Sequence, residues 1–193
     1  MIKEGQVGAA AFNSMIDGYG KLGAARIASR KFEQMKKHSL QPTLQSYYAI
    51  IHAHAQAGDM PSVLAHLSGM QKKGLQPDTV TFTAIIGGFA LAGQLQRAEL
   101  WMEKMRGYSA EPNAVTYAAL LRGCAKEHDT ARAERLLRDM QDARIEVSVV
   151  IFNLLINIHA ADRSPKRAEA TLRRLVASRI EPDVVSYSTV MKA

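Results

Sequence analysis

The chain has 193 residues, with 25 Lys and Arg against 18 Asp and Glu, a net charge of +7 and a single cysteine. One cysteine excludes an internal disulfide, and no apolar run approaches the roughly 18 residues that a membrane-spanning helix needs. The positive charge is compatible with an anionic partner but does not identify one.

The chain is organised as a repeat. An aromatic residue recurs at every thirty-fifth position, without insertion or deletion, at Phe12, Tyr47, Phe82, Tyr117, Phe152 and Tyr187. Self-similarity at a fixed period of 20 to 50 residues is typical of solenoids. We divide the chain into a lead-in, five repeats and a truncated sixth repeat, at 1–8, 9–43, 44–78, 79–113, 114–148, 149–183 and 184–193. Because the sixth repeat stops after ten residues, we expect a fragment of a longer array.

Each repeat is predicted to form two amphipathic helices. In the first repeat, apolar residues three and four apart indicate helices over about 12–22 and 25–37. Gly23, Gly58 and Gly93 lie between the two helices, where a residue that tolerates positive φ allows the chain to reverse. In the fourth and fifth repeats, His128 and Arg163 take this position.

A pair of such helices cannot bury its apolar face alone, so neighbouring repeats must stack and share one core. The predicted fold is therefore all-α, a right-handed α-solenoid of stacked helix-turn-helix repeats. Aligned columns of apolar residues are assigned to that core, among them Met35, Met70, Met105 and Met140. The arginines of the second helices, such as Arg132, Arg135 and Arg138, are interleaved with acids and are interpreted as a solvated outer face.

No catalytic or metal-binding motif emerges from the sequence. Cys124 and His128 are four residues apart, but Cys124 occupies a packing column and two ligands do not complete a zinc site. We therefore expect a binding protein with no enzymatic activity, no metal and no cofactor.

Two segments carry a family resemblance. The segments 70–78 and 78–88, MQKKGLQPD and DTVTFTAIIGG, resemble pentatricopeptide repeats of the pure 35-residue class, and the resemblance covers residues 9–193. It implies binding of single-stranded RNA in a mitochondrion or chloroplast, at about one base per repeat.

In that family a base is read by the residue after the aromatic and by the residue after the closing proline. The resemblance therefore implies the pairs Asn13 with Thr43, Tyr48 with Asp78, Thr83 with Asn113, Ala118 with Ser148, and Asn153 with Asp183, followed by Ser188 without its partner. By analogy Asn153 with Asp183 favours uracil, Thr83 with Asn113 favours adenine, and Asn13 with Thr43 favours a pyrimidine. The second and fourth pairs depart from the family's usual combinations.

An alternative applies to the second member of every pair. Thr43, Asp78, Asn113, Ser148 and Asp183 precede a helix and are good N-cap residues, so a solenoid that never met RNA would favour the same types.

The resemblance also implies residues that wedge between bases. These are Val80, Val115, Val150 and Val185, with Ala10 and Gln45 as poor substitutes. Lys21 and Lys126 share a column at the end of the first helix and are the expected phosphate contacts.

The leading hypothesis is thus an adaptor that binds single-stranded RNA in organellar RNA processing, stability or translation, together with other proteins of a ribonucleoprotein assembly. The alternative is a structural solenoid that holds protein or ribosomal RNA within a larger assembly such as an organellar ribosome.

Overall fold

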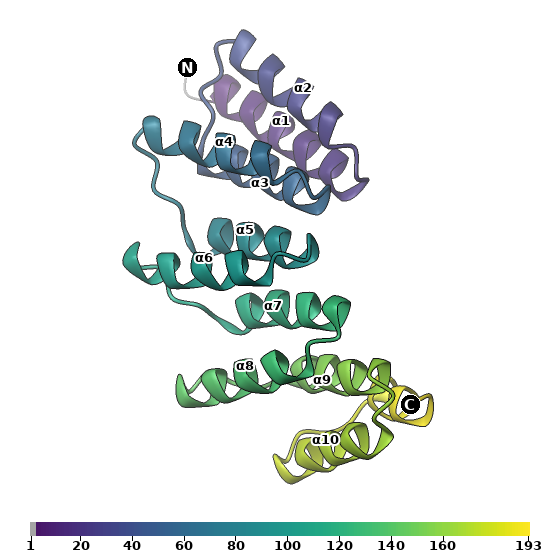
Figure 1. The fold of residues 1–193 in the computed structure, drawn as a ribbon. Helices are drawn as coiled ribbons and strands as arrows, with labels where there is room; N and C mark the ends of the chain where they lie inside the picture. Colours follow the sequence, from purple (N-terminus) through teal and green to yellow (C-terminus); the bar gives the residue numbers. More distant parts are fainter. Residues whose placement is uncertain (1–2) are drawn as a thin grey trace. The chain divides into compact units, whose positions relative to one another are not determined.

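Each of the five complete repeats folds as a helical hairpin. The computed structural model describes the backbone of residues 3–193 and the side chains from residue 8 onward, and the regular structure in this range is entirely α-helical (Figure 1). The first helices of the repeats are α1 (Lys3–Lys21), α3 (Leu44–Gln56), α5 (Thr79–Leu91), α7 (Ala114–Glu127), α9 (Val149–Ala161) and α11 (Val184–Met191). The second helices are α2 (Ala25–Lys37), α4 (Met60–Lys72), α6 (Leu95–Gly107), α8 (Thr130–Asp142) and α10 (Pro165–Ala177).

The period of the sequence is also the period of the structure. From α3 onward, consecutive first helices begin 35 residues apart, and so do all of the second helices. The helix α1 is the exception, because it begins at Lys3 and not near Phe12 as the periodicity predicted. Later first helices follow a segment that turns away from the preceding hairpin. In α1 the helix-favouring run Ala9–Ala11 continues the helix toward its N-terminus.

The helices form two units, one ending at Glu111 and the other beginning at Pro112. In the first unit α1, α3 and α5 pack side by side, and α2, α4 and α6 pack on their hairpin partners. In the second unit α7, α9 and α11 form the corresponding row, with α8 and α10 packed against it. Each unit is therefore a short stack of hairpins with an inner row of first helices. Between residues 3 and 193 no helix combines the length and apolar character that a bilayer span requires.

The aligned apolar columns form the core of each unit. The buried aromatic and methionine side chains are Tyr47, Phe82, Tyr117 and Phe152, and Met35, Met70, Met105 and Met140. Each such side chain stabilises the fold by about 1.5–3 kcal/mol relative to full exposure. The aromatic of the sixth repeat differs, because Tyr187 is 52% exposed. It lies on α11, the last helix that the structure describes.

Left-handed residues close every hairpin. Gly23, Gly58 and Gly93 have φ of 71°, 72° and 73°, and their aligned counterparts His128 and Arg163 have φ of 54° and 50°. The position of His128 in the turn is therefore confirmed, and Cys124, one turn earlier, is fully buried in the packing column. A second left-handed column joins consecutive repeats, at Ser39, Gly74, Ser109, Arg144 and Arg179.

The first helices approach each other through small residues. A Cβ atom placed on Gly88 of α5 would lie 2.8 Å from Ala55 Cβ and 3.1 Å from Ala55 Cα of α3. Backbone atoms cannot move aside as a flexible side chain can, so this contact fixes how closely α3 and α5 pack. A Cβ atom placed on Gly18, near the C-terminal end of α1, would meet nothing within 4 Å.

We therefore expect opposite effects from the same substitution at these two glycines. Gly88→Ala should lower the free energy of unfolding by about 1–3 kcal/mol, because it overpacks the interface between α3 and α5. Gly18→Ala should raise it by about 0.5–1 kcal/mol, because alanine favours a helix interior. Urea denaturation of both variants measures the two values, and a loss of stability in both would contradict the packing argument.

A histidine cluster, with His54 buried and His66 half-buried, lies between the hairpins of the first unit. His66 of α4 lies edge-on to Phe32, with ring centroids 5.3 Å apart, and its centroid is 5.3 Å from that of His54. His54 accepts or donates hydrogen bonds with Ser29 at 2.7 Å and Asp59 at 3.1 Å. Burial, followed by the neighbouring His54, lowers the pKa of His66 to about 4.

This pKa predicts a loss of stability in acid. An unfolded histidine takes up its proton near pH 6.5, whereas folded His66 resists protonation until about pH 4. The unfolded state therefore binds more protons between these values, and stability falls as the pH is lowered through that window. His66→Leu, which places here the residue type of the aligned Leu136, should remove about 1–2 kcal/mol of the acid-dependent loss at pH 5. Equal slopes of unfolding free energy against pH for the variant and the parent chain would contradict this assignment.

Candidate nucleic-acid interface

The second member of every predicted base-reading pair is an N-cap. Thr43, Asp78, Asn113, Ser148 and Asp183 immediately precede α3, α5, α7, α9 and α11. Four of the five side chains accept a hydrogen bond from a backbone N–H of the first helical turn, as Asp78 does from Thr81 at 2.8 Å. Ser148 is the exception, with no side-chain cap bond. The capping interpretation therefore holds for four positions, and base reading has to use the groups that the cap leaves available.

The pair in the fifth repeat is brought together directly. The Asn153 side-chain amide, on α9, donates to both carboxylate oxygens of Asp183, at 3.0 and 3.1 Å. The Ser186 hydroxyl donates to Asn153 Oδ1 at 2.6 Å, while the Ser186 backbone N–H donates to Asp183 Oδ1 at 2.8 Å. These backbone and amide bonds hold the pKa of the Asp183 carboxyl below its usual value, so the group is ionised at neutral pH.

This network leaves Asn153 half satisfied. A side-chain amide has two N–H donors and an oxygen with two lone pairs. Asp183 takes one donor and Ser186 takes one lone pair, which leaves one donor and one acceptor on a half-buried side chain at the N-terminal end of α9. The orientation of the amide is fixed by three hydrogen bonds before any ligand binds.

The first members of the first and second pairs, Asn13 and Tyr48, line a common pocket between α1 and α3. It has a volume of about 290 Å³ and is lined by residues that include Asn13, Asp17, Lys21, Tyr48 and His52. Asn13 is only 6% exposed, and its Oδ1 has no hydrogen-bond partner among the described residues. The Tyr48 ring stacks on His52, with centroids 5.6 Å apart. This pocket therefore presents an aromatic surface and an unsatisfied acceptor, and Thr43 is engaged in its capping box with Ser46.

The third and fourth pairs differ in their chemistry. Asn113 caps α7 through Oδ1 alone, accepting from Val115 and Thr116 at 3.0 and 3.1 Å. Thr83 belongs to the first unit and Asn113 to the second. Ala118 is buried and has no polar side-chain group, and Ser148 makes no cap bond. The fourth pair thus offers a base only one hydroxyl.

The predicted wedge residues form an exposed apolar column. Val80, Val115, Val150 and Val185 are between 53% and 59% exposed, each in the first turn of a first helix. Ala10 and Gln45, the poor substitutes, are also exposed. An exposed valine therefore recurs at the same position of four consecutive repeats. Ser188, which begins the sixth pair, donates from its hydroxyl to the Val185 carbonyl at 3.3 Å.

The two lysines predicted to contact phosphate lie at the ends of first helices. Lys21 forms an ion pair with Asp17 at 2.7 Å, and its side chain is 68% exposed. The hydrogen bond and charge of Asp17 raise the pKa of Lys21. Lys126 is exposed in the last turn of α7. The positive charge of Lys21 is therefore partly neutralised by Asp17 of the same helix.

The sequence analysis missed a column of buried hydroxyls. Ser46, Thr81, Thr116 and Ser186 are fully buried three residues after the caps, and three of them complete capping boxes. The fifth repeat has Ile151 at this position, so Ser148 lacks the reciprocal hydroxyl. A Ser or Thr three residues after an N-cap candidate was the signal that could have revealed the column.

An inner row of capped first helices, with polar pairs and exposed valines at their N-terminal ends, defines an α-solenoid repeat protein of the helical-hairpin class. The PPR repeat family model matches residues 7–56, 42–91 and 77–126, the PPR repeat model matches 115–145, and the pentatricopeptide repeat domain model matches 135–193. The chain belongs to the pentatricopeptide repeat family. A search of curated proteins gave no match.

Solved structures support the same fold. The chain is similar to the maize pentatricopeptide repeat protein PPR10, solved in complex with an 18-nt psaJ RNA element, with 19% identity and a TM-score of 0.77. The match covers 97% of this chain but 28% of PPR10, so this chain spans less than a third of that relative. The PPR domain of Arabidopsis thaliana protein-only RNase P 1, in complex with tRNA, matches with 15% identity and a TM-score of 0.71, over 96% of this chain and 97% of that one. At these low identities, the structural similarity shows the fold alone, which is an all-α solenoid.

The caps predict a measurable contrast in stability. Asn113→Ala removes a side chain that accepts from two backbone N–H groups and should lower the free energy of unfolding by about 1 kcal/mol. Ser148→Ala at the aligned position removes no cap bond and should change stability by less than about 0.5 kcal/mol. Chemical denaturation of both variants makes the comparison, and equal losses would contradict the assigned cap bonds.

Proposed function

We propose that this chain binds single-stranded RNA along its inner row of first helices, with base preference set by the polar pairs at their N-terminal ends. The observation that carries the proposal is the Asn153, Asp183 and Ser186 network, which fixes one amide donor and one amide acceptor side by side. A group held in place before binding costs less conformational entropy when the ligand arrives.

The free donor and acceptor of Asn153 match uracil. Uracil offers an N–H donor flanked by carbonyl acceptors on its Watson–Crick edge, so one N–H can bond a carbonyl while Oδ1 accepts from the base. Cytosine presents a ring nitrogen acceptor where uracil has its N–H, which leaves Oδ1 without that partner. The exposed Val150 and Val185, at the same position of adjacent repeats, supply apolar contacts for the base faces.

The other repeats contribute unequally. Thr83 with Asn113 favours adenine by family analogy, and Asn13 with Thr43 favours a pyrimidine. In the second repeat, Tyr48 provides a stacking surface, and stacking on an aromatic ring accepts any base. We assign the fourth pair, Ala118 with Ser148, little selectivity because Ala118 has no hydrogen-bonding side chain.

The comparisons support an RNA ligand and suggest a cellular setting. PPR10 was solved with an RNA element and the RNase P 1 repeat domain with tRNA. We propose that this chain is a non-enzymatic adaptor for an organellar transcript, in a mitochondrion or chloroplast, acting in RNA processing, stability or translation alongside other proteins. The organelle rests on family resemblance alone. Import of the full-length protein fused to a fluorescent reporter tests this assignment.

Selection of RNA from a random pool tests the binding mode. We expect enrichment of short single-stranded motifs with an adenine two places from a uracil. This spacing follows from the third and fifth repeats, if each repeat contacts one base. No enrichment, or equal affinity for duplex and unstructured RNA, would overturn single-strand reading and favour the structural alternative, in which the solenoid holds protein or ribosomal RNA by shape.

Substitution of Asn153 tests base reading separately from charge. Asn153→Ala should reduce the preference for uracil over cytosine by about tenfold, since a bidentate base contact is worth about 1–3 kcal/mol. The slope of log affinity against log salt should stay unchanged, because no phosphate contact is lost. Asn157→Ala, on an exposed residue one turn later in α9, is the matched control and should keep the preference. An unchanged preference in Asn153→Ala would contradict the assignment.

A further inference from the structure

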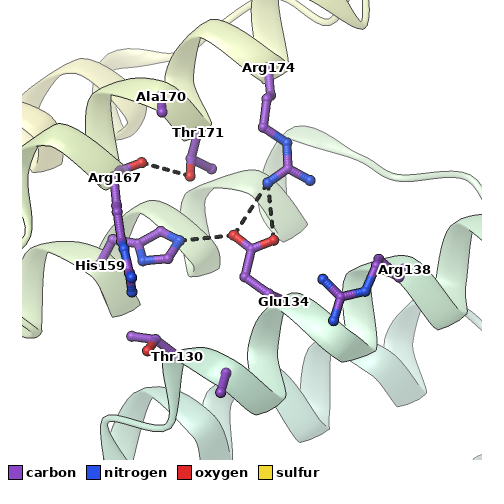
Figure 2. A pocket seen from close by; sticks show the side chains of 9 residues that line it. Thr130, Glu134, Arg138, His159, Arg167, Ala170, Thr171 and Arg174 are labelled. Carbon is purple, nitrogen blue, oxygen red and sulfur yellow. Dashed lines mark hydrogen bonds and ion pairs between the residues drawn. The ribbon is translucent and has the colours of Figure 1, made fainter.

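A polar pocket lies between second helices of the second unit, outside the inner row. It has a volume of about 520 Å³ and is lined by α8, α9 and α10, including Glu134, Arg138, His159, Arg167 and Arg174 (Figure 2). This volume falls within the range of roughly 300–1,000 Å³ that is typical of small-molecule sites.

The pocket has an excess of positive charge. Its lining contains three arginines and one glutamate, for a formal charge of +2 with His159 neutral. Arg174 donates to both oxygens of Glu134, at 3.0 and 3.2 Å, and His159 Nε2 bonds the same carboxylate at 3.1 Å. Burial alone would raise the pKa of Glu134, but the bonds from Arg174 and His159 outweigh it and leave that pKa below its usual value.

Two of the guanidinium groups remain uncommitted. Arg138 and Arg167 lie on either side of Glu134 in Figure 2, and neither guanidinium has an ion pair or hydrogen bond within the described part of the chain. His159 is 3% exposed, and its Nδ1 also lacks a partner there. The pocket therefore combines unused donors with a buried ring nitrogen that no protein group satisfies.

Comparison with aligned repeats explains why the pocket exists here. Between α4 and α6, the residue aligned with Thr171 is Trp101, whose indole stacks on Phe89, the residue aligned with His159, with centroids 6.3 Å apart. Between α2 and α4, the residues aligned with the three arginines are Glu33, Ser62 and Gly69. Of these three pairs of second helices, only α8 and α10 combine a small residue in the Thr171 column with three arginines.

We propose that this pocket binds the terminal phosphate of a nucleotide, either free or at the 5′ end of an RNA. A phosphomonoester carries about −1.5 to −2 charges at pH 7, which balances the formal charge of the lining, whereas a backbone phosphodiester carries one. Guanidinium groups suit phosphate because they donate two parallel hydrogen bonds to its oxygens. The remaining volume accommodates a nucleoside, and a guanidinium plane such as that of Arg138 provides a surface on which a base stacks.

The lining argues against a peptide as the ligand. Protein partners are anchored mainly by aromatic or large apolar side chains buried in matching pockets. This pocket has small side chains, Ala131, Ala170, Thr130 and Thr171, in place of large apolar ones. Charged and hydrogen-bonding groups therefore dominate the recognition of a ligand by this pocket.

Calorimetric titration with uridine 5′-monophosphate and with uridine, at constant ionic strength, tests the proposal. We expect the monophosphate to bind and uridine to bind at least about tenfold more weakly, because uridine lacks the charge-assisted hydrogen bonds. The double substitution Arg138→Gln and Arg167→Gln should lower affinity for the monophosphate by about tenfold or more. Arg173→Gln is the matched control, since Arg173 lies on α10 with Arg167, pairs with Glu169 and is outside the lining of the pocket.

A second variant fills the pocket without changing its charge. Thr171→Trp introduces the side chain that the aligned Trp101 already provides in the third repeat, and it should abolish binding of the monophosphate. The double arginine variant gives an independent result if the larger side chain impairs folding. Equal affinity of the double variant and the parent chain for the monophosphate would overturn the proposal.

Two RNAs that differ only in the 5′ group separate this site from the proposed RNA interface. The 5′-phosphorylated form should bind about tenfold more tightly than the 5′-hydroxyl form, and the double arginine variant should lose that difference. Asn153→Ala should keep the difference while losing base preference, so either site can fail without the other. Binding of a phosphorylated peptide that depends on the arginines, without binding of the monophosphate, would assign the pocket to a protein partner and overturn the proposal.

Discussion

Close packing of the first helices is the constraint on which the rest of the structure depends. A single hairpin leaves the apolar face of both helices exposed, so stability comes from the contact between one repeat and the next. That contact is tight enough that Gly88 has no room for a Cβ beside the Ala55 backbone. A helix displaced along its axis would bring larger side chains to this point. The 35-residue spacing and the small residues therefore support each other from α3 onward, where the first helices begin at a constant interval.

A fixed helix start has a consequence for function. The N-terminal ends of the first helices form a regular series, and each needs a cap for its unpaired N–H groups. The side chains that serve as caps are the same polar types that can bond a nucleobase, so one residue meets both demands. Asp183 illustrates the combination, because its carboxylate accepts from the Ser186 backbone and also orients the Asn153 amide. Structural and binding roles are coupled at this position, whereas at Asn113 the cap uses Oδ1 alone.

The sequence predicted the repeat because its determinants are local and periodic. The helices, the turn positions of His128 and Arg163 and the buried methionines all followed from aligning columns. The start of α1 and the exposure of Tyr187 did not, because each depends on contacts with neighbouring segments and not on the repeat period. The resemblance paired Asn153 with Asp183, but the hydrogen bonds between them and the part played by the Ser186 hydroxyl were not predicted. Periodicity identifies the faces of a helix, but it does not show which polar atoms satisfy each other across two helices.

The same limit applies to the pocket between α8 and α10, where arginines that were interpreted as part of a solvated outer face line an open pocket. The decisive residue is Thr171, in a column that otherwise contains Lys31, His66, Trp101 and Leu136. This column varies because it lies between neighbouring second helices, away from the close contacts of the inner row. In a solenoid each repeat contacts only its neighbours, so a small residue here opens one groove and leaves the other repeats undisturbed. A repeat protein can therefore acquire a second binding site on its outer helices without altering the register that positions the inner one.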